Sequence, residues 1–305
     1  MSWFFLAIIG PFLYAMTNHI DKILLEKYFK EGGVGTLILF SSLLSTLALP
    51  FLFWADPTAF QVGGFSILIL AIGGVLNVLV LWFYFLALKD EEASITIVFY
   101  QLVPVIGCIL GYFILDEVLT SMQLIAMAIV ILGTTIISFE IDAENNFKLR
   151  KSTIVLMTAA SFFWALESVL FKAVALEENV WRSLFWEHVM LMLVGGLIFV
   201  FISSYRKHFL AAVRENSLGI MSLNVANESL YTIGNFVFAF AYLLAPIGLV
   251  LLTNSFQPIF VLAIGILLTL FFPKLTAEKI EAKHLWQKVI SILITGLGTY
   301  LLLGF

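Results

Sequence analysis

The side chains best able to do chemistry in this sequence are polar groups embedded in long apolar runs. Five of them lie between Leu218 and Leu244, at spacings that place them on one face of a helix. They are Asn224, Asn227, Glu228, Tyr231 and Asn235. An ionisable group at the middle of a bilayer costs about 2.5–3.5 kcal/mol on insertion scales. We therefore expect this face to look into a helix bundle or an aqueous cavity and to form the wall of a solute path.

Two roles are open to Glu228 on this face. As a protonated acid that is hydrogen-bonded to the neighbouring amides, it would hold helices together. As a carboxylate that carries a proton or binds a cation, it would take part in transport. The spacing of the residues agrees with both roles.

A second polar group lies in two consecutive apolar runs. Glu167 follows Trp164 in the first run, and Glu187 and His188 are adjacent in the second. Because histidine titrates near neutrality, acids and an imidazole among apolar helices could form a proton relay. Lys172 could instead neutralise one of the acids. Alternatively, Glu187 and His188 could lie one or two turns from a membrane interface.

Further polar residues end the first apolar run. Asn18 and His19 could close one end of the solute path, whereas Asp21 and Lys22 are typical of a solvated helix end.

Two other runs carry polar residues just before a proline. The pairs are Tyr100 and Gln101 before Pro104, and Asn254 and Gln257 before Pro258. A proline leaves a backbone carbonyl free one turn earlier, and that carbonyl could bind a solute or ion. An ordinary helix kink explains the same prolines equally well.

The elements that must position these residues are membrane helices. The chain is 62% hydrophobic and 12% charged with a mean hydropathy of +1.07, which excludes an ordinary soluble domain. The apolar runs are continuous rather than alternating, which favours helices over a β-barrel. The first run lacks a basic start and a small-residue cleavage site, so we expect it to be retained rather than cleaved.

The runs long enough to cross a bilayer, at about 20 residues each, fall into two sets of five. The first set is Trp3–His19, Val34–Trp54, Gly63–Leu88, Ala93–Leu115 and Ser121–Phe139. The second set is Thr153–Ala175, Trp181–Tyr205, Leu218–Leu244, Pro246–Phe272 and Leu285–Leu303. The sequence therefore predicts an all-α integral membrane protein with ten transmembrane helices and a hydrophilic linker at residues 140–152.

The two halves resemble each other weakly. A shift of 150 aligns Phe12, Ala15 and Lys22 with Phe162, Ala165 and Lys172, and a shift of 154 aligns Ala87, Pro104 and Gly111 with Ala241, Pro258 and Gly265. An odd number of helices in each copy gives the copies opposite orientations, which is typical of secondary transporters. Chance similarity between apolar sequences is the alternative.

The stretch from Tyr84 to Ile137 resembles the EamA-like repeat of the drug/metabolite transporter superfamily. The matching positions are Tyr84, Ala87, Ala93, Pro104, Glu117, Thr120, Gln123 and Gly133. The second copy keeps Ala241, Pro258 and Gly296 but has a longer turn between the last two. The resemblance implies two inverted five-helix repeats, at residues 1–139 and 153–305. It also implies a solute cavity lined chiefly by helices 1, 3, 4, 6, 8 and 9.

Charge predicts the orientation of the chain. All lysines and arginines except Lys172 and Arg182 fall in the odd-numbered loops. The positive-inside rule then makes those loops cytoplasmic and puts both termini outside. The resemblance implies the opposite arrangement, with both termini inside. We favour the charge distribution.

Other classes of protein find little support. The sequence lacks a phosphate-binding loop, a GxSxG elbow and an HExxH motif, so we expect neither an enzyme nor direct use of ATP. The single cysteine, Cys108, lies in an apolar run and has no metal-ligand partner. We expect no cofactor, no bound metal and no nucleic-acid partner.

Together these features predict a secondary active transporter of a small polar metabolite, such as an amino acid or amine, in the cell (inner) membrane. The working hypothesis couples transport to protons through Glu228, assisted by Glu167 or Glu187. Two alternatives are a flippase for a lipid-linked headgroup and a membrane interaction protein that transports nothing. The sequence allows a monomer or a homodimer.

Overall fold

The protein was analysed as a computed structural model, which describes residues 2–29, 33–90, 96–97, 99–142, 151–215, 217–271 and 285–303. These residues form helices joined by short turns, and none of them lies in a strand. Within these described ranges, six helical segments are long and apolar enough to cross a membrane. The prediction of an all-helical, multi-pass membrane protein is therefore confirmed.

The first part of the chain runs up and down the bundle several times. Its helical segments are α1 (Ser2–Ala7), α2 (Ile9–Ile23), the π-helical η1 (Leu24–Tyr28), α3 (Gly33–Leu44), η2 (Ser45–Ala48), α4 (Leu49–Ala55), α5 (Gly64–Asp90), η3 (Phe99–Gln101), α7 (Leu102–Leu115) and α8 (Ser121–Asp142). Several of these follow one another directly, so that residues 2–28 and 33–55 each make one crossing.

The second part of the chain is built in the same way. Its segments are α9 (Lys151–Glu177), α10 (Val180–Phe201), α11 (Ser203–Glu215), α12 (Ser217–Tyr242), α13 (Ile247–Leu252), η5 (Thr253–Phe256), α14 (Gln257–Phe271) and α15 (Leu285–Leu303). Helix α12 is long enough to cross a membrane, but its polar face keeps it out of the six apolar spans.

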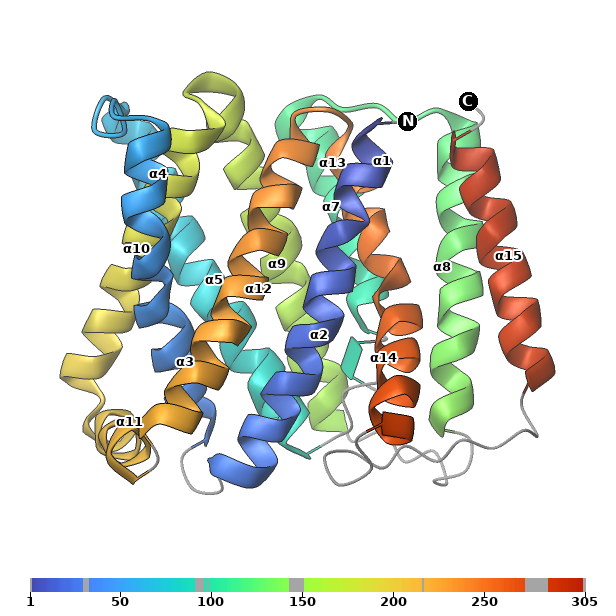
Figure 1. The fold of residues 1–305 in the computed structure, drawn as a ribbon. Helices are drawn as coiled ribbons and strands as arrows, with labels where there is room; N and C mark the ends of the chain where they lie inside the picture. The colour runs from blue at the N-terminus through green and yellow to red at the C-terminus, as the bar shows by residue number, and fades with distance from the viewer. Residues whose placement is uncertain are drawn as a thin grey trace.

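The helices are arranged roughly side by side, and both ends of the chain lie at the same end of the bundle (Figure 1). Helix α11 lies at the opposite end. It is amphipathic, and its lysine and arginines place positive charge at that end of the molecule.

Helices from the two parts of the chain interleave at the centre. Helix α5 packs along α9, and α2 packs along α12. Helices α8 and α15 pair at one edge (Figure 1). Small residues allow this close approach, because a side chain at Gly133 would overlap Thr295 on α15.

Two helices are interrupted near the middle of the bundle. Residues Thr253–Phe256 form a 3₁₀ turn just before Pro258, and Phe99–Gln101 form another just before Pro104. The two turns pack against each other, and Nε2 of Gln101 donates a hydrogen bond to the carbonyl of Ser255 at 3.2 Å. Proline explains the interruptions, since it cannot donate the backbone hydrogen bond that a regular helix requires.

Three predicted boundaries either differ from the structure or fall outside the residues that it describes. The first crossing does not end at His19 but continues helically to Tyr28. The ends of the predicted linker belong to α8 and α9, and its residues 143–150 lie outside the described part of the chain. The longer turn of the second copy falls mostly on residues 272–284, which are also outside it.

Candidate functional site

A partly enclosed cavity of about 60 Å³ lies between helices from both parts of the chain. Its walls come from α2, α3, α5, η3, α9, α12 and α14. The lining residues are Tyr14, Thr17, Asn18, Asp21, Ser41, Asn77, Val80, Leu81, Tyr84, Phe85, Tyr100, Trp164, Glu167, Asn227, Glu228, Tyr231 and Gln257. Apart from Ser41 on α3, they lie on the crossings that the family resemblance implies.

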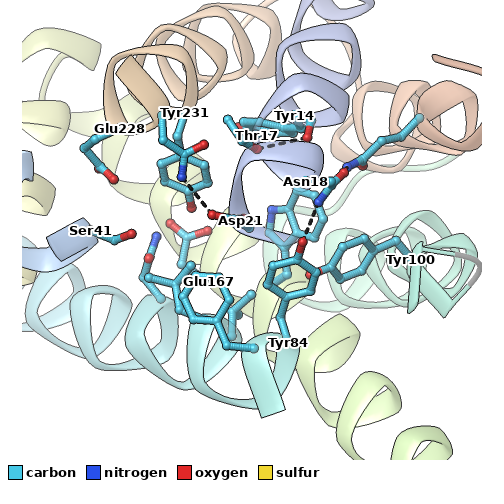
Figure 2. A pocket seen from close by; sticks show the side chains of 17 residues that line it. Tyr14, Thr17, Asn18, Asp21, Ser41, Tyr84, Tyr100, Glu167, Glu228 and Tyr231 are labelled. Atoms are coloured by element: carbon cyan, nitrogen blue, oxygen red, sulfur yellow. Dashed lines mark hydrogen bonds between the residues drawn. The ribbon is translucent and has the colours of Figure 1, made fainter. Parts of the chain in front are cut away.

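Asp21 is held in the wall of this cavity (Figure 2). It is 6% exposed, and Oδ1 accepts a hydrogen bond from Nδ2 of Asn227 at 2.7 Å. Tyr84 of α5 lines the same cavity. The expectation that Asp21 ends the helix in solvent is therefore wrong. Because α2 continues past His19, Asp21 shares a helix face with Tyr14, one further turn inside the bundle.

A chain of hydrogen bonds joins three crossings next to Asp21. The hydroxyl of Tyr84 accepts a hydrogen bond from Nδ2 of Asn18 at 2.7 Å. Oδ1 of Asn18 in turn accepts one from Nε2 of Gln257 at 2.6 Å. Asn18 thus lies within the cavity wall and links α2 to α5 and α14, rather than closing one end of a path.

Glu228 lies in the same cavity, and its side chain converges with those of Asp21 and Glu167 (Figure 2). It is 5% exposed, and Ser41 on α3 and Asp21 on α2 line the same cavity. The prediction that Glu228 faces the inside of the bundle is confirmed.

The other polar residues of α12 divide between the cavity and the packing of the helices. Asn227 and Tyr231 line the cavity together with Asn77 of α5, whose buried Oδ1 has no hydrogen-bond partner among the described residues. Asn235 accepts a hydrogen bond from the hydroxyl of Tyr14 at 2.6 Å, outside the lining set. Asn224 donates to the carbonyl of Ile220 on its own helix at 2.8 Å.

Glu167 and Glu187 form a carboxyl pair between α9 and α10. Both side chains are buried, and the hydroxyl of Ser168 donates to Oε2 of Glu167 at 3.5 Å. Only Glu167 lines the cavity, so Glu187 lies behind it.

The two predicted histidines are bound to backbone carbonyls. Nδ1 of His188 donates to the carbonyl of Leu184 at 2.8 Å, and Nε2 of His19 donates to that of Val261 at 3.0 Å. Neither histidine lines the cavity. His19 instead connects α2 to α14, and His188 packs against Phe236.

Of the four polar residues near the helix interruptions, two line the cavity and two do not. Tyr100 and Gln257 line the cavity, whereas Gln101 and Asn254 do not. Asn254 is 1% exposed, and neither of its side-chain polar atoms has a partner. Such buried atoms ordinarily require water or a ligand.

Aromatic rings form one continuous wall of the cavity. The ring centroids of Tyr231 and Tyr14 are 5.4 Å apart, and those of Tyr14 and Trp164 are 6.0 Å apart. Trp164 then contacts Tyr100 edge to face at 4.8 Å, and Tyr100 lies 6.0 Å from Tyr84. Trp164, predicted as a site residue, is therefore the middle ring of this wall.

An ion pair lies at the end of the bundle where the chain begins and ends. Nζ of Lys172 is 2.5 Å from Oε1 of Glu117, and it also donates to the carbonyl of Ala245 at 2.7 Å. Oε2 of Glu117 accepts a hydrogen bond from the backbone of Ile247 at 2.6 Å. Lys172 therefore neutralises Glu117, rather than Glu167 or Glu187.

A second polar cluster lies where the turn after α4 meets the first turn of α10. Asp56 is bonded to Thr58 and to Arg182, whose Nε is 3.2 Å from Oδ2. Hydrogen bonds from Thr58, together with the charge of Arg182, lower the pKa of Asp56. This cluster ties the turn after α4 to the start of α10.

Several residues of the cavity were not predicted, chiefly Asp21, Tyr14, Ser41 and Asn77. The spacing of Tyr14, Thr17, Asn18 and Asp21 would have revealed one polar helix face if the first crossing had been extended beyond His19. Asn77 stands alone in an apolar helix, and Ser41 is one of several hydroxyl residues in its run, so spacing does not single out either of them. Among the described residues, no group of three or more His, Cys, Asp or Glu side chains could hold a metal ion.

A multi-pass bundle with a buried polar cavity between its two parts is an arrangement typical of membrane transporters. Residues 1–139, less than half of the chain, match the family model described as the EamA-like transporter family. The matched stretch includes the repeat around Pro104, so this part of the chain is similar to that family, as the repeat predicts.

Individual proteins of known sequence or structure are also similar to the chain. A WAT1-related protein of Arabidopsis thaliana is 25% identical over 148 residues, a match that covers 46% of this chain and only 39% of the relative. A protein of solved crystal structure, described only as a protein, aligns over 98% of both chains with a TM-score of 0.56 and 14% identity. This likeness supports the fold along the whole chain.

Proposed function

We propose that the protein is a secondary active transporter of a small polar metabolite, which works by alternating access between two inverted halves. The observation that carries this proposal is the buried cavity, whose walls come from both halves and hold the carboxyl groups of Asp21, Glu167 and Glu228. An uncompensated charge inside a membrane carries a large free-energy cost, so buried carboxyl groups there usually bind a solute or carry a proton.

The packing of the helices supports the inverted repeat. Under an inverted repeat, α2 corresponds to α9, α5 to α12, α7 to α14 and α8 to α15. Exchange of these helices turns the contact between α5 and α9 into the contact between α12 and α2, and both contacts are present. It also turns the contact between α7 and α9 into that between α14 and α2, and it leaves the pair of α8 and α15 unchanged. A contact network that survives this exchange is expected of two copies of one fold.

The side-chain contacts of the halves follow the same relation. Nζ of Lys22 donates to the carbonyl of Leu88 at the end of α5, at 3.1 Å. Lys172, its counterpart in the second half, donates to the carbonyl of Ala245 just after α12. These equivalent contacts lie on helices that cross the bundle in opposite directions, as inverted repeats require.

Proton coupling is part of the proposal, with Glu228 as the principal carrier. Its side chain lines the cavity together with Ser41 and Asp21, and Tyr231 lies one turn away on α12. Asp21 and the pair of Glu167 and Glu187 supply further positions for protons near it. Alternating access would expose these groups to each side of the membrane in turn.

The orientation and location remain part of the proposal. Positive charge on α11 and the odd-numbered loops places that end of the bundle in the cytoplasm and both termini outside. The Lys172–Glu117 pair would then close the outer end of the bundle. We assign the protein to the cell (inner) membrane, as a monomer or a homodimer.

The test is charge movement in proteoliposomes on a sensor electrode, with pools of amino acids, amines, sugars and nucleosides at two pH values. A transient from one pool that is lost in Glu228→Gln would support an electrogenic, proton-coupled carrier. Loss of gradient-driven uptake with retained solute exchange would assign Glu228 to the proton. Equal loss of both would overturn that assignment.

A lipid-scrambling assay on the same proteoliposomes tests the rival function. Scrambling of a lipid-linked headgroup, together with no response to any soluble pool, would replace the transporter proposal with a flippase. If the protein neither scrambles lipid nor moves any solute, the result would indicate an interaction protein.

A further inference from the structure

We propose that the cavity binds a small organic ammonium ion, rather than an anion or a neutral solute. The inference rests on the proposed transport function and deepens it by naming the charge and size of the solute. Three observations carry it: the charges that line the cavity, the aromatic wall and the available space.

The charges of the lining are of one sign. Three carboxyl groups, those of Asp21, Glu167 and Glu228, converge on the cavity (Figure 2). No lysine, arginine or histidine is found among the described residues that line it. An anion bound there would meet acids without a balancing cation, whereas an ammonium ion would supply the missing charge.

The cations on the same helices are engaged elsewhere. Lys22, next to Asp21, lies 3.3 Å from Glu26 and donates to a backbone carbonyl. Lys172, on the helix of Glu167, is paired with Glu117. The protein therefore brings acids to this cavity and directs the neighbouring lysines away from it.

The aromatic wall suits the same kind of ligand. The consecutive rings of Tyr231, Tyr14, Trp164, Tyr100 and Tyr84 all line the cavity. Aromatic faces attract cations through the ring quadrupole, most strongly where water is excluded. Acids and rings around one space therefore provide both the ion pair and the cation–π contacts that an ammonium group uses.

The space limits the size of the ion. A single water needs about 10–15 Å³ of such space, so a cavity of about 60 Å³ has room for about four to six water-sized groups. The solute is then a short amine with few non-hydrogen atoms, too small to carry a side chain or sugar. Amide and hydroxyl groups of Asn18, Thr17 and Ser41 could bind a polar substituent on it.

The chemistry of transport follows from these contacts. Buried carboxyl groups require either protons or a cation. An entering ammonium ion can replace the proton of Glu228 or Asp21: the carboxyl O–H bond breaks, the proton passes to water, and the carboxylate pairs with the ammonium ion. When the ion leaves, a proton from water forms the O–H bond again, so that the cation and the proton exchange across the membrane through the same carboxyl groups.

The test measures binding to the purified, full-length protein by isothermal titration calorimetry at constant ionic strength. The probes are isopropylammonium, 2-propanol and acetate, which share one branched skeleton and differ in charge. We expect isopropylammonium to bind at least about tenfold more tightly than either of the others, as an added charge and ring contact would give. Equal or tighter binding of 2-propanol or acetate would overturn the inference, as would no binding of isopropylammonium.

Two variants assign binding to the cavity. Glu228→Gln should weaken isopropylammonium binding and leave any residual 2-propanol binding unchanged. The matched control is Glu26→Gln, since the Glu26 side chain is 59% exposed and lies outside the cavity. If both variants weaken binding equally, the ion binds by surface charge and the inference is wrong.

Transport assays separate this inference from the proposed function. If the protein transports an anion or a sugar and binds no ammonium ion, the ammonium inference is wrong and the transport proposal holds. If it binds the ammonium ion tightly but moves no solute, the ammonium inference holds and the transport proposal is wrong.

Discussion

Nζ of Lys172 lies 2.5 Å from Oε1 of Glu117, and this ion pair joins the last turns of α9 to the turn after α7. The same carboxylate accepts a hydrogen bond from the backbone of Ile247 at the start of α13. One side chain from the first half therefore holds two segments of the second half at the end of the bundle where the chain begins and ends.

Breaking this pair should open that end of the bundle. Lys172→Met leaves Glu117 without its cation, which should lower stability by about 1–3 kcal/mol. Cys108, the single cysteine, lies on α7 against Gly248 of α13 and can report the opening. We expect faster maleimide labelling of Cys108 in the variant, measured in proteoliposomes.

Exchange of the two charges supplies the check on this prediction. Lys172→Glu combined with Glu117→Lys should return labelling toward that of the native chain. Glu26→Gln, at the exposed partner of Lys22, should leave it unchanged. Unaltered labelling in Lys172→Met would show that the pair does not hold the halves together.

Tyr84→Phe should impair the cavity without changing its shape. The hydroxyl that it removes accepts a hydrogen bond from Nδ2 of Asn18 at 2.7 Å, so the buried amide of Asn18 loses a partner. We expect a loss of about 1–3 kcal/mol in stability and a reduced transport rate at saturating solute. Tyr112→Phe is the matched control, because Tyr112 is 55% exposed on the outer surface. Similar losses in both variants would refute the role given to the hydroxyl.

Adjacent glycines on α10 should respond oppositely to alanine. A Cβ at Gly195 would overlap Ser42 on α3, so Gly195→Ala should lower stability by about 1–3 kcal/mol through overpacking. A Cβ at Gly196 meets nothing within 4 Å, so Gly196→Ala should be neutral or stabilising. Thermal unfolding in detergent compares the two. Equal midpoints would mean that α10 and α3 do not pack as closely as described.

The Asp56 cluster predicts a defined dependence of stability on pH. Thr58 and Arg182 lower the pKa of Asp56 in the folded protein below its ordinary value of 3.8. A lowered folded pKa gives stabilisation that is present above the unfolded pKa and is lost as the pH falls through the folded value. Asp56→Asn should therefore destabilise the protein equally at pH 5 and pH 8, with a smaller difference below about pH 4. A penalty that changes between pH 5 and pH 8 would contradict this.

Patterns along single helices predicted much of the protein. Continuous apolar runs required helices in a membrane, because only a helix satisfies its own backbone hydrogen bonds in lipid. The polar face of α12 indicated that Glu228 points inward, since three- and four-residue spacings hold wherever the helix lies. The repeat around Pro104 indicated the EamA-like family.

Only the tertiary structure decided which inward-facing groups meet. Asp21 joined the cavity because α2 continues for another turn and α12 brings Asn227 to its carboxylate. Lys172 found Glu117 rather than a nearer acid in the sequence, because α7 ends beside α9. The spacing of residues determines which face of a single helix each side chain lies on. The partner that a side chain meets depends on the depth, tilt and neighbours of several helices, and the spacing along one sequence does not record these.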